Sequence, residues 1–325
     1  MFGAVLALAS AGFFGLNNAT VRRGILKSTV LQGMAITVPL GVPLFIAFSL
    51  LMGGFEAMLG WGMPAWIWMS SAGVVHFVIG RYGNYRATQT LGATLSTPIQ
   101  QLSILVSLML AFIFLGENIN LLNLIGILLI MVGPMVLVRG RKKATAAGKA
   151  KGFEPQFGPG LFWGSVCAFG YGVSPLLIAL GLGAESTLAD AVAGVLVSYV
   201  AASIVVAILV IAAGGRAYLS DLDGTSAKWF LFSTVFVALS QMFRYLALSV
   251  APVTVVVPIQ RLSVVFRVLF NAMINRDHEV LDRGVIFSIV LAVIGSVALT
   301  ADSEFLVSHA GFDPREVRFL IAPLF

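Results

Sequence analysis

The apolar positions of the chain form ten long segments, separated by short breaks that carry polar residues, glycine or proline. Each segment has about 20 residues, the length of a helix that crosses a bilayer, and the apolar runs are continuous rather than alternating. Because lipid offers no hydrogen bonds to the backbone, such runs are expected to be helical. The pattern therefore predicts an all-α polytopic membrane protein with ten transmembrane helices, at residues 3–21, 30–52, 65–85, 93–115, 121–138, 159–181, 188–213, 227–248, 253–275 and 281–301.

Composition supports a membrane protein. Of the 325 residues, 59% are hydrophobic and only 10% are charged, and the mean hydropathy is +0.99. Soluble domains carry about 25% charged residues. The net charge of +6 would indicate nucleic acid in a soluble domain, but here the positive residues are concentrated in loops, which is typical of cytoplasmic membrane loops. We therefore predict a lipid bilayer as the surroundings and no nucleic-acid partner.

A short sequence occurs twice. Pro-Ile-Gln-x-Leu-Ser stands at residues 98–103 and again at 258–263, and the same offset of 160 aligns Tyr85 with Tyr245. Residues 85–103 and 245–263 share eight identities in 19 positions without a gap, where average residue usage gives roughly one or two. This repeat predicts an internal duplication.

The predicted helices divide into two sets of five. Residues 1–138 form the first repeat, a basic linker follows at 139–158, the second repeat covers 159–302, and a tail covers 303–325. Because five is odd, the second repeat enters the membrane from the opposite side, which is the inverted arrangement of many secondary transporters. The fold class is thus two inverted five-helix repeats.

Loop charge predicts the orientation. The loops after the odd-numbered helices carry nearly all of the loop Lys and Arg residues, six of them in the linker. Cytoplasmic loops have this excess. We therefore predict that the 139–158 linker is cytoplasmic, that both termini face outward and that the protein lies in the inner or plasma membrane.

A helix ending in Leu115-Gly116-Glu117 is followed by a short polar turn and then by a helix that carries Gly126 and Gly133. This arrangement resembles the EamA-type members of the drug/metabolite transporter superfamily. The second half has a degenerate copy at residues 276–279, followed by Leu281 and Gly295.

The resemblance implies a ten-helix carrier whose central cavity is lined by the first, third and fourth helices of each half. It also implies that Glu117 is a structural turn residue. In this family both termini usually face the cytoplasm, which conflicts with the orientation that the loop charges predict, and we give more weight to the charges of this chain.

Polar side chains form one stripe on the fourth helix of each repeat. Helical spacing places Gln100 and Ser103 on one face with Ser107, and it places Gln260, Ser263 and Arg267 together in the second repeat. Such stripes are expected to face the bundle interior. They predict either a substrate cavity or hydrogen bonds between helices, and we favour the cavity for the two glutamines.

Arginines inside the predicted spans indicate the charge of the substrate. Arg261 and Arg267 lie in mid-helix, where a buried cation costs at least about 2.5 kcal/mol, whereas Arg244 and Arg81 stand near helix ends and are either buried or extended to the surface. No Asp or Glu lies well inside a span. Guanidinium groups bind carboxylate or phosphate through two parallel hydrogen bonds. We therefore predict an anionic or zwitterionic substrate, with additional contacts from Tyr85, Tyr171 and Tyr245. The polar residues of the first helices, Asn17, Asn18 and Ser174, either add such contacts or form hydrogen bonds between helices.

The predicted function is secondary-active transport of a small metabolite, such as an amino acid, organic acid or phosphorylated compound, by alternating access. His76 is either a proton-coupling residue or a hydrogen-bonded packing residue, since imidazole titrates near neutral pH. The alternatives are a membrane-embedded enzyme or lipid-phosphate-handling protein, and a structural membrane subunit. Catalytic groups are sparse and scattered, so we predict no enzyme, no cofactor and no metal site, in a monomer or homodimer.

Overall fold

The computed structural model describes residues 2–116, 154–276 and 283–300, with scattered positions between 120 and 136 and Ala322. Several predictions concern positions outside these described residues. They are the turn role of Glu117, most of the 139–158 linker, the degenerate copy at 277–279 and nearly all of the 303–325 tail.

The described part of the chain is helical and contains eight helices long and apolar enough to cross a membrane. They are Phe2–Gly24, Val30–Met52, Met63–Leu91, Ala93–Leu115, Phe157–Leu182, Leu188–Ala212, Gly224–Val250 and Val253–Ile274. These agree with eight of the ten predicted helices, so the protein is a multi-pass helical membrane protein. The predicted fifth helix falls on sparsely described residues, and the predicted tenth coincides with α17 (Arg283–Thr300), which is not one of the eight. The count of ten stays a prediction.

Several spans consist of more than one helical element. The first half contains α1 (Phe2–Gly24), α2 (Val30–Thr37), α3 (Gly41–Met52), α4 (Gly54–Leu59), α5 (Met63–Gly73), the π-helix η1 (Val74–Gly80), α6 (Arg81–Leu91), α7 (Ala93–Gln100) and α8 (Ser103–Leu115). The second half contains α11 (Phe157–Leu182), α12 (Leu188–Ala212), α13 (Arg216–Ser220), α14 (Gly224–Val250), α15 (Val253–Arg261), α16 (Ser263–Ile274) and α17.

The fourth span of each half is broken within the repeated sequence. α7 ends at Gln100 and α8 begins at Ser103, while α15 ends at Arg261 and α16 begins at Ser263. At the first break the Leu102 amide donates to the Ile99 carbonyl at 3.1 Å, a tighter bond than that of an α-helix. A proline three to five residues upstream, Pro98 or Pro258, removes a backbone donor. The two predicted spans are therefore found, Ala93–Leu115 and Val253–Ile274, and the repeated sequence divides each of them into two helical elements.

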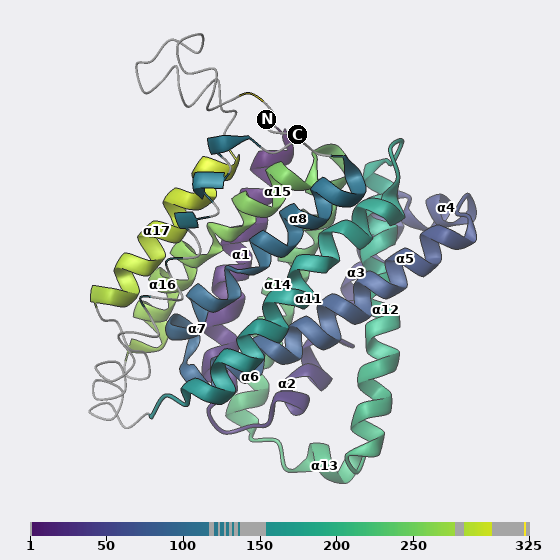
Figure 1. Ribbon diagram of the computed structural model, residues 1–325. Helices are drawn as coiled ribbons and strands as arrows, with labels where there is room; N and C mark the ends of the chain where they lie inside the picture. The colour runs from purple at the N-terminus through teal and green to yellow at the C-terminus, as the bar shows by residue number, and fades with distance from the viewer. Residues whose placement is uncertain are drawn as a thin grey trace.

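The two halves pack against each other in a reciprocal way. α1 packs against α14 and α16 of the second half, and α11 packs against α6 and α8 of the first. Figure 1 shows α1, α11 and α14 side by side in the middle of the bundle. The first helix of each half thus contacts the third and fourth helices of the other. This is the packing that a two-fold relation between halves would produce, and the inverted repeat itself stays a prediction.

Matching hydrogen bonds recur in the two halves. The Tyr85 hydroxyl donates to Thr37 Oγ1 at 3.1 Å, and the Tyr245 hydroxyl donates to Ser198 Oγ at 2.8 Å. Each bond joins the third span to the second span of the same half. Each second span also begins with a threonine N-cap in a capping box, Thr29 in α2 and Thr187 in α12. The shared architecture therefore extends beyond the repeated sequence.

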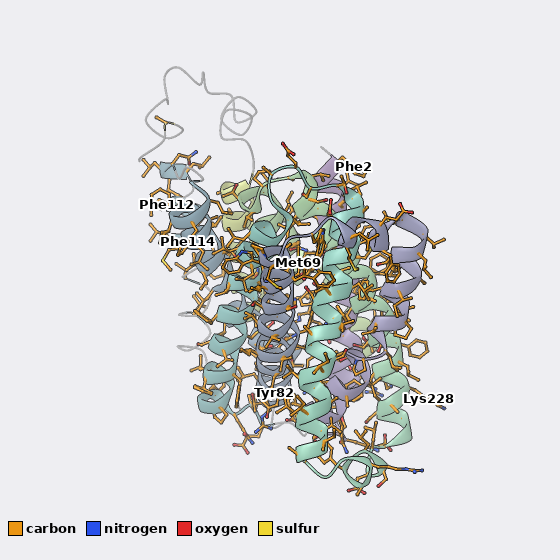
Figure 2. All side chains as sticks on the ribbon, turned by 90° about the vertical axis from the view of Figure 1, so that its right-hand side faces the viewer. Phe2, Met69, Tyr82, Phe112, Phe114 and Lys228 are labelled. Carbon is orange, nitrogen blue, oxygen red and sulfur yellow. The ribbon has the colours of Figure 1, made fainter. Side chains whose placement is uncertain are left out.

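The two ends of the bundle differ in charge. α2, α13 and the end of α6 lie at one end, opposite to α4 (Figure 1). Lys228 lies toward this end and Phe2 toward the other (Figure 2). Described Lys and Arg residues in loops and helix ends gather at the first end, whereas Glu56, Glu185 and Asp190 lie at the second. This asymmetry agrees with the loop charges behind the predicted orientation, which itself stays a prediction.

Arg22 is an exception to the predicted loop positions. α1 continues to Gly24, three residues beyond the predicted end, and Arg22 is only 1% exposed. Its Nη1 donates to the Thr88 carbonyl of α6 at 3.1 Å. The prediction that Arg22 lies in a loop is wrong, because a carbonyl of a neighbouring helix is within reach of its guanidinium.

Candidate functional site

A small polar cavity lies where α1, η1, α11, α14 and α15 converge. Its volume is about 20 Å³, which is room for about one water molecule. The walls carry two arginines and a histidine together with hydroxyl, amide and aromatic groups, namely Ser10, Ala11, Phe14, His76, Tyr171, Ser240, Gln241, Arg244, Gln260 and Arg261. First and third helices of both halves contribute, with the fourth helix of the second half, so five of the six helices implied by the resemblance line it.

Arg244 reaches from α14 to two other helices. Its Nη1 lies 2.9 Å from His76 Nδ1 and donates to Gln241 Oε1 at 3.2 Å, while its Nη2 donates to Ser174 Oγ of α11 at 3.1 Å. A guanidinium has only donors, so the nitrogen of His76 that faces it must be an unprotonated acceptor. Arg244 is 4% exposed. Of the two alternatives for this residue, the structure places it in the interior.

His76 lies in the π-helix in the middle of the third span. The Tyr171 ring stacks on the imidazole with centroids 4.3 Å apart. Short π-helical segments are rare and often lie at functional sites. Here Gly80 of η1 packs against the backbone of Gly170 in α11, where a Cβ on Gly170 would come within 2.8 Å of the Gly80 Cα. The two glycines allow this close crossing, which brings Tyr171 onto the imidazole.

Arg261 lies at the end of α15, where the two copies of the repeated sequence meet. Gln101 donates from Nε2 to the Arg261 carbonyl at 3.3 Å, and these two positions are equivalents under the offset of 160. The Arg261 Nε is buried without a hydrogen-bond partner among the described residues. Beside it, Gln260 donates to Ser10 Oγ of α1 at 2.7 Å. Arg261 is therefore a cavity-lining cation with donors available for a ligand.

Arg267 lies in a separate cluster rather than in the cavity wall. Its Nη1 donates to Thr97 Oγ1 at 2.9 Å and to Gln100 Oε1 at 3.0 Å. Its Nη2 donates to the side-chain oxygens of Asn18 and Asn84. These four acceptors come from three helices of the first half, so Arg267 joins the halves. The structure thus separates Arg267 and Gln100 from Arg261 and Gln260, which we had expected to form one site.

The other predicted site residues have partners within the framework. Tyr85 and Tyr245 bond to hydroxyls of the second spans, as described above. Asn17 Oδ1 accepts from Ser233 Oγ at 2.7 Å, and Ser103 Oγ donates to the Gln100 carbonyl at 2.6 Å. Ser263 is buried without lining the cavity. Arg81 donates to the Thr37 carbonyl at 3.1 Å and to the Tyr199 hydroxyl at 2.9 Å, so it too is interior.

Sequence reasoning did not single out several of the cavity residues. Ser10 and Ser240 each donate a hydroxyl to the carbonyl of the other, at 2.8 and 2.9 Å, and Gln241 stands beside Arg244. These residues lie outside the repeated sequence. One signal was available: Gln241 aligns with Arg81 and Arg244 with Asn84 under the same offset of 160.

Acidic residues are absent from the middle of the spans in the part of the chain that the structure describes. Glu56, Glu154, Glu185, Asp190, Asp221 and Asp223 all lie in loops, caps or first helical turns. The described part of the chain contains no cluster of His, Cys, Asp and Glu that could bind a metal ion.

At the surface, backbone amides at the start of α14 donate hydrogen bonds to the Asp223 carboxylate. These bonds, first of all the one from Ser226, lower the pKa of Asp223.

These features define a multi-pass helical membrane protein with a polar, cationic interior between two similar halves. A solved structure described as "Crystal structure of protein" has the same fold, with a TM-score of 0.60 over 93% of this chain and 97% of its own, at 16% identity. Residues 52–162 match the family model described as "Magnesium transporter NIPA".

Individual relatives give the same result. "Probable magnesium transporter NIPA3" of Arabidopsis thaliana is 31% identical over 136 residues, which is 42% of this chain and 31% of that protein. "Magnesium transporter NIPA3" of Pongo abelii is 29% identical over 136 residues, 42% of this chain and 28% of that protein. The match thus spans about a third of these curated relatives. The NIPA family belongs to the drug/metabolite transporter superfamily. Over this segment the comparison therefore agrees with the predicted superfamily, and the EamA type stays a prediction.

Proposed function

We propose that the protein is a secondary-active carrier that moves a small anionic or zwitterionic metabolite across the inner or plasma membrane. The observation that carries the proposal is the pair of arginines, Arg244 and Arg261, in the wall of a cavity closed by both halves. In the described spans no acidic side chain lies beside them. A carboxylate or phosphate would supply the acceptors that two guanidinium groups favour.

A cavity of about 20 Å³ is too small for a metabolite, so the structure corresponds to a closed state of the proposed carrier. Substrate entry requires the halves to separate. The contacts that would break lie on α1, where Ser10 bonds to Ser240 of α14 and accepts from Gln260 of α15. Broken helices at such an interface are typical of alternating-access carriers.

The proposed roles differ from the initial expectation in one respect. Arg261 and Arg244 would bind the anionic group, and Gln260 would orient it. Arg267, with four acceptors of the first half around it, would instead stabilise the frame together with Gln100. The second copy of the repeated sequence therefore contributes cavity-lining residues, Gln260 and Arg261, and the first copy contributes Gln100, which accepts a hydrogen bond from Arg267.

We propose that a proton on His76 accompanies the substrate. The imidazole can accept from Arg244 only when it is unprotonated, so protonation would break this contact and leave Arg244 donors for the substrate. Arg244 of α14 contacts the imidazole, the Tyr171 ring of α11 stacks on it, Arg261 of α15 lines the same cavity, and Arg81 of α6 adds a further positive charge nearby. In His76→Gln, which keeps an acceptor for Arg244 but cannot titrate, Arg244 should stay engaged, so substrate binding should weaken and any remaining uptake should move no protons. Substrate-driven acidification of proteoliposomes that persists in this variant would refute the coupling.

The principal test is uptake into proteoliposomes, with amino acids, organic acids and sugar phosphates as candidate substrates. We expect Arg261→Gln to reduce uptake at least tenfold, since it removes a charge-assisted contact worth about 1.5–3 kcal/mol. The matched control is Arg216→Gln, which removes an exposed charge of α13. An unchanged rate for the true substrate in folded Arg261→Gln would disprove the assignment.

The similarity over residues 52–162 favours a second candidate, transport of Mg²⁺. This ion prefers oxygen ligands, carboxylates above all, which the described spans do not provide. Mg²⁺ influx can be followed with an indicator enclosed in the same proteoliposomes. Influx that Arg261→Gln leaves unchanged, with no uptake of any anion, would establish the cation as substrate and reject our proposal.

A further inference from the structure

A second cleft opens at the basic end of the bundle, away from the central cavity. It lies between the start of α2, the end of α6, the end of α12 and α13, and its volume is about 570 Å³. This is within the range of sites for small ligands, about 300–1,000 Å³. Its lining is amphipathic and consists of Thr29, Val30, Leu31, Tyr82, Arg86, Gln89, Leu209 and Tyr218.

The polar side of the cleft is held by hydrogen bonds that join three segments. Thr29 bonds to the Tyr218 hydroxyl, and Gln32 Nε2 donates to the Tyr218 carbonyl at 3.0 Å. Gln89 Nε2 donates to the Ser28 carbonyl at 3.2 Å. α13 is therefore attached to the loop before α2, which is itself attached to α6. The cleft is a built feature of the fold rather than a gap beside a loop.

Arg86 gives the cleft its charge. Its Nη1 donates to Gln89 Oε1 at 2.7 Å, and its Nε is buried without a hydrogen-bond partner among the described residues. The lining contains no acidic side chain. A guanidinium fixed in this way is suited to an anion with several oxygen acceptors, and phosphate fits best.

The surroundings indicate that this phosphate belongs to a lipid. Leu31 of α2 and Leu209 of α12 form apolar walls of the cleft together with the buried Val30, and Leu209 is 41% exposed. Tyr82 packs edge-on against Trp163 with centroids 5.0 Å apart. Tyrosine and tryptophan concentrate at the level of the lipid headgroups, and basic pockets between spans at the positively charged side bind anionic headgroups.

We propose that this cleft binds the phosphate group of an anionic phospholipid, with Arg86 as its principal ligand, the Thr29 and Tyr218 hydroxyls beside it, and an acyl chain along the Val30, Leu31 and Leu209 wall. The ligand would fix α13 and α6 to each other at this end of the bundle. This inference rests on the cleft alone and does not depend on which substrate the central cavity takes.

The test uses the full chain in detergent micelles, with lipid affinity measured by thermal stabilisation and bound lipid counted by native mass spectrometry. Phosphatidylglycerol should stabilise the protein in a saturable way, and Arg86→Gln should weaken its binding on the order of tenfold. The matched control Lys228→Gln removes an exposed charge at the same end and should leave the affinity unchanged. Lys228 is visible at this end in Figure 2.

Two ligand controls identify the source of the phosphate. Phosphatidylcholine has the acyl chains without the net charge, and glycerol phosphate has the charge without the chains. The proposal would be overturned if phosphatidylcholine stabilised the protein as much as phosphatidylglycerol does, or if Arg86→Gln bound phosphatidylglycerol as tightly as the unmodified protein. If glycerol phosphate bound as tightly as phosphatidylglycerol, the ligand would be a free anion rather than a lipid. If Arg86→Gln does not fold, Leu209→Trp fills the cleft from its apolar wall and should lower the count of bound phosphatidylglycerol; an unchanged count would overturn the proposal.

Discussion

The two halves of the molecule share a framework and differ in charge. Each has a tyrosine of the third span bonded to a hydroxyl of the second, a capped second span and a fourth span broken after a proline. At equivalent positions, however, the first half has Asn84, Gln101 and Ser107 where the second has Arg244, Arg261 and Arg267. The two halves thus have a similar frame, and these three positions carry a cation only in the second half.

This asymmetry explains how two of the buried arginines, Arg244 and Arg267, are tolerated. Arg267 donates to oxygens of Asn18, Asn84, Thr97 and Gln100, all in the first half, and Arg244 donates across the interface to His76. A buried cation is costly unless it is hydrogen-bonded. The first half therefore provides neutral acceptors for Arg244 and Arg267, and loss of Arg267 is expected to cost more than loss of its equivalent, Ser107.

The largest effect is expected at Arg267. Replacement by Gln removes most of the four hydrogen bonds and leaves buried acceptors on three helices, so the free energy of unfolding should fall by about 3 kcal/mol. The equivalent change in the first half, Ser107→Ala, removes one bond to the Gly172 carbonyl and should cost about 1 kcal/mol. Chemical unfolding in detergent measures both. Equal losses at the two positions would contradict the proposed asymmetry.

Exchange of the residues at positions 101 and 261 tests whether the cation can act from either half of the protein. Gln101 and Arg261 are equivalents in direct contact, so the double variant Gln101→Arg/Arg261→Gln moves the cation across the point where the repeats meet. We expect the double variant to recover part of the uptake lost in Arg261→Gln, roughly tenfold, or about 1.4 kcal/mol in the barrier. Gln101→Ala/Arg261→Gln is the control without a cation. If uptake recovers equally in the two double variants, a positive charge at this point is not required for transport.

Features that depend on a short stretch of sequence could be predicted, whereas features that depend on contacts between distant helices could not. Apolar length is local, so eight spans were predicted, most of them to within a few residues. The contact between Gln101 and Arg261 joins equivalent positions of the repeat, and the sequence alone did not predict it. The π-helix at His76 depends on the glycine crossing between Gly80 and Gly170, which no local pattern reveals. Arg261 lines the cavity whereas Arg267 is bonded to the first half. This difference depends on which hydrogen-bond acceptors the other helices place near each guanidinium, and the sequence does not show it.

Matched tyrosines provide a test with a smaller effect. Tyr85→Phe and Tyr245→Phe each remove one buried hydrogen bond, so each should lower the free energy of unfolding by about 1 kcal/mol, and by similar amounts. Because both hydroxyls already bond within the frame, the KM for the transported substrate should not change. A raised KM in either variant would restore the initial expectation that these tyrosines contact the substrate.

The smallest effect is expected at the threonine caps. Thr29 and Thr187 each accept a hydrogen bond from a backbone amide three residues later, in Gln32 and Asp190, and replacement of such a cap by Ala costs about 1 kcal/mol or less. Thr29 also bonds to Tyr218 of another element beside the basic cleft, whereas the second side-chain bond of Thr187 stays within its own capping box, where its hydroxyl donates to Asp190 Oδ2 at 2.7 Å. Thermal unfolding should therefore show the greater loss for Thr29→Ala. Addition of phosphatidylglycerol should widen the difference, since only Thr29 lies in the proposed lipid site; a difference that lipid leaves unchanged would argue that the cap acts on α2 alone.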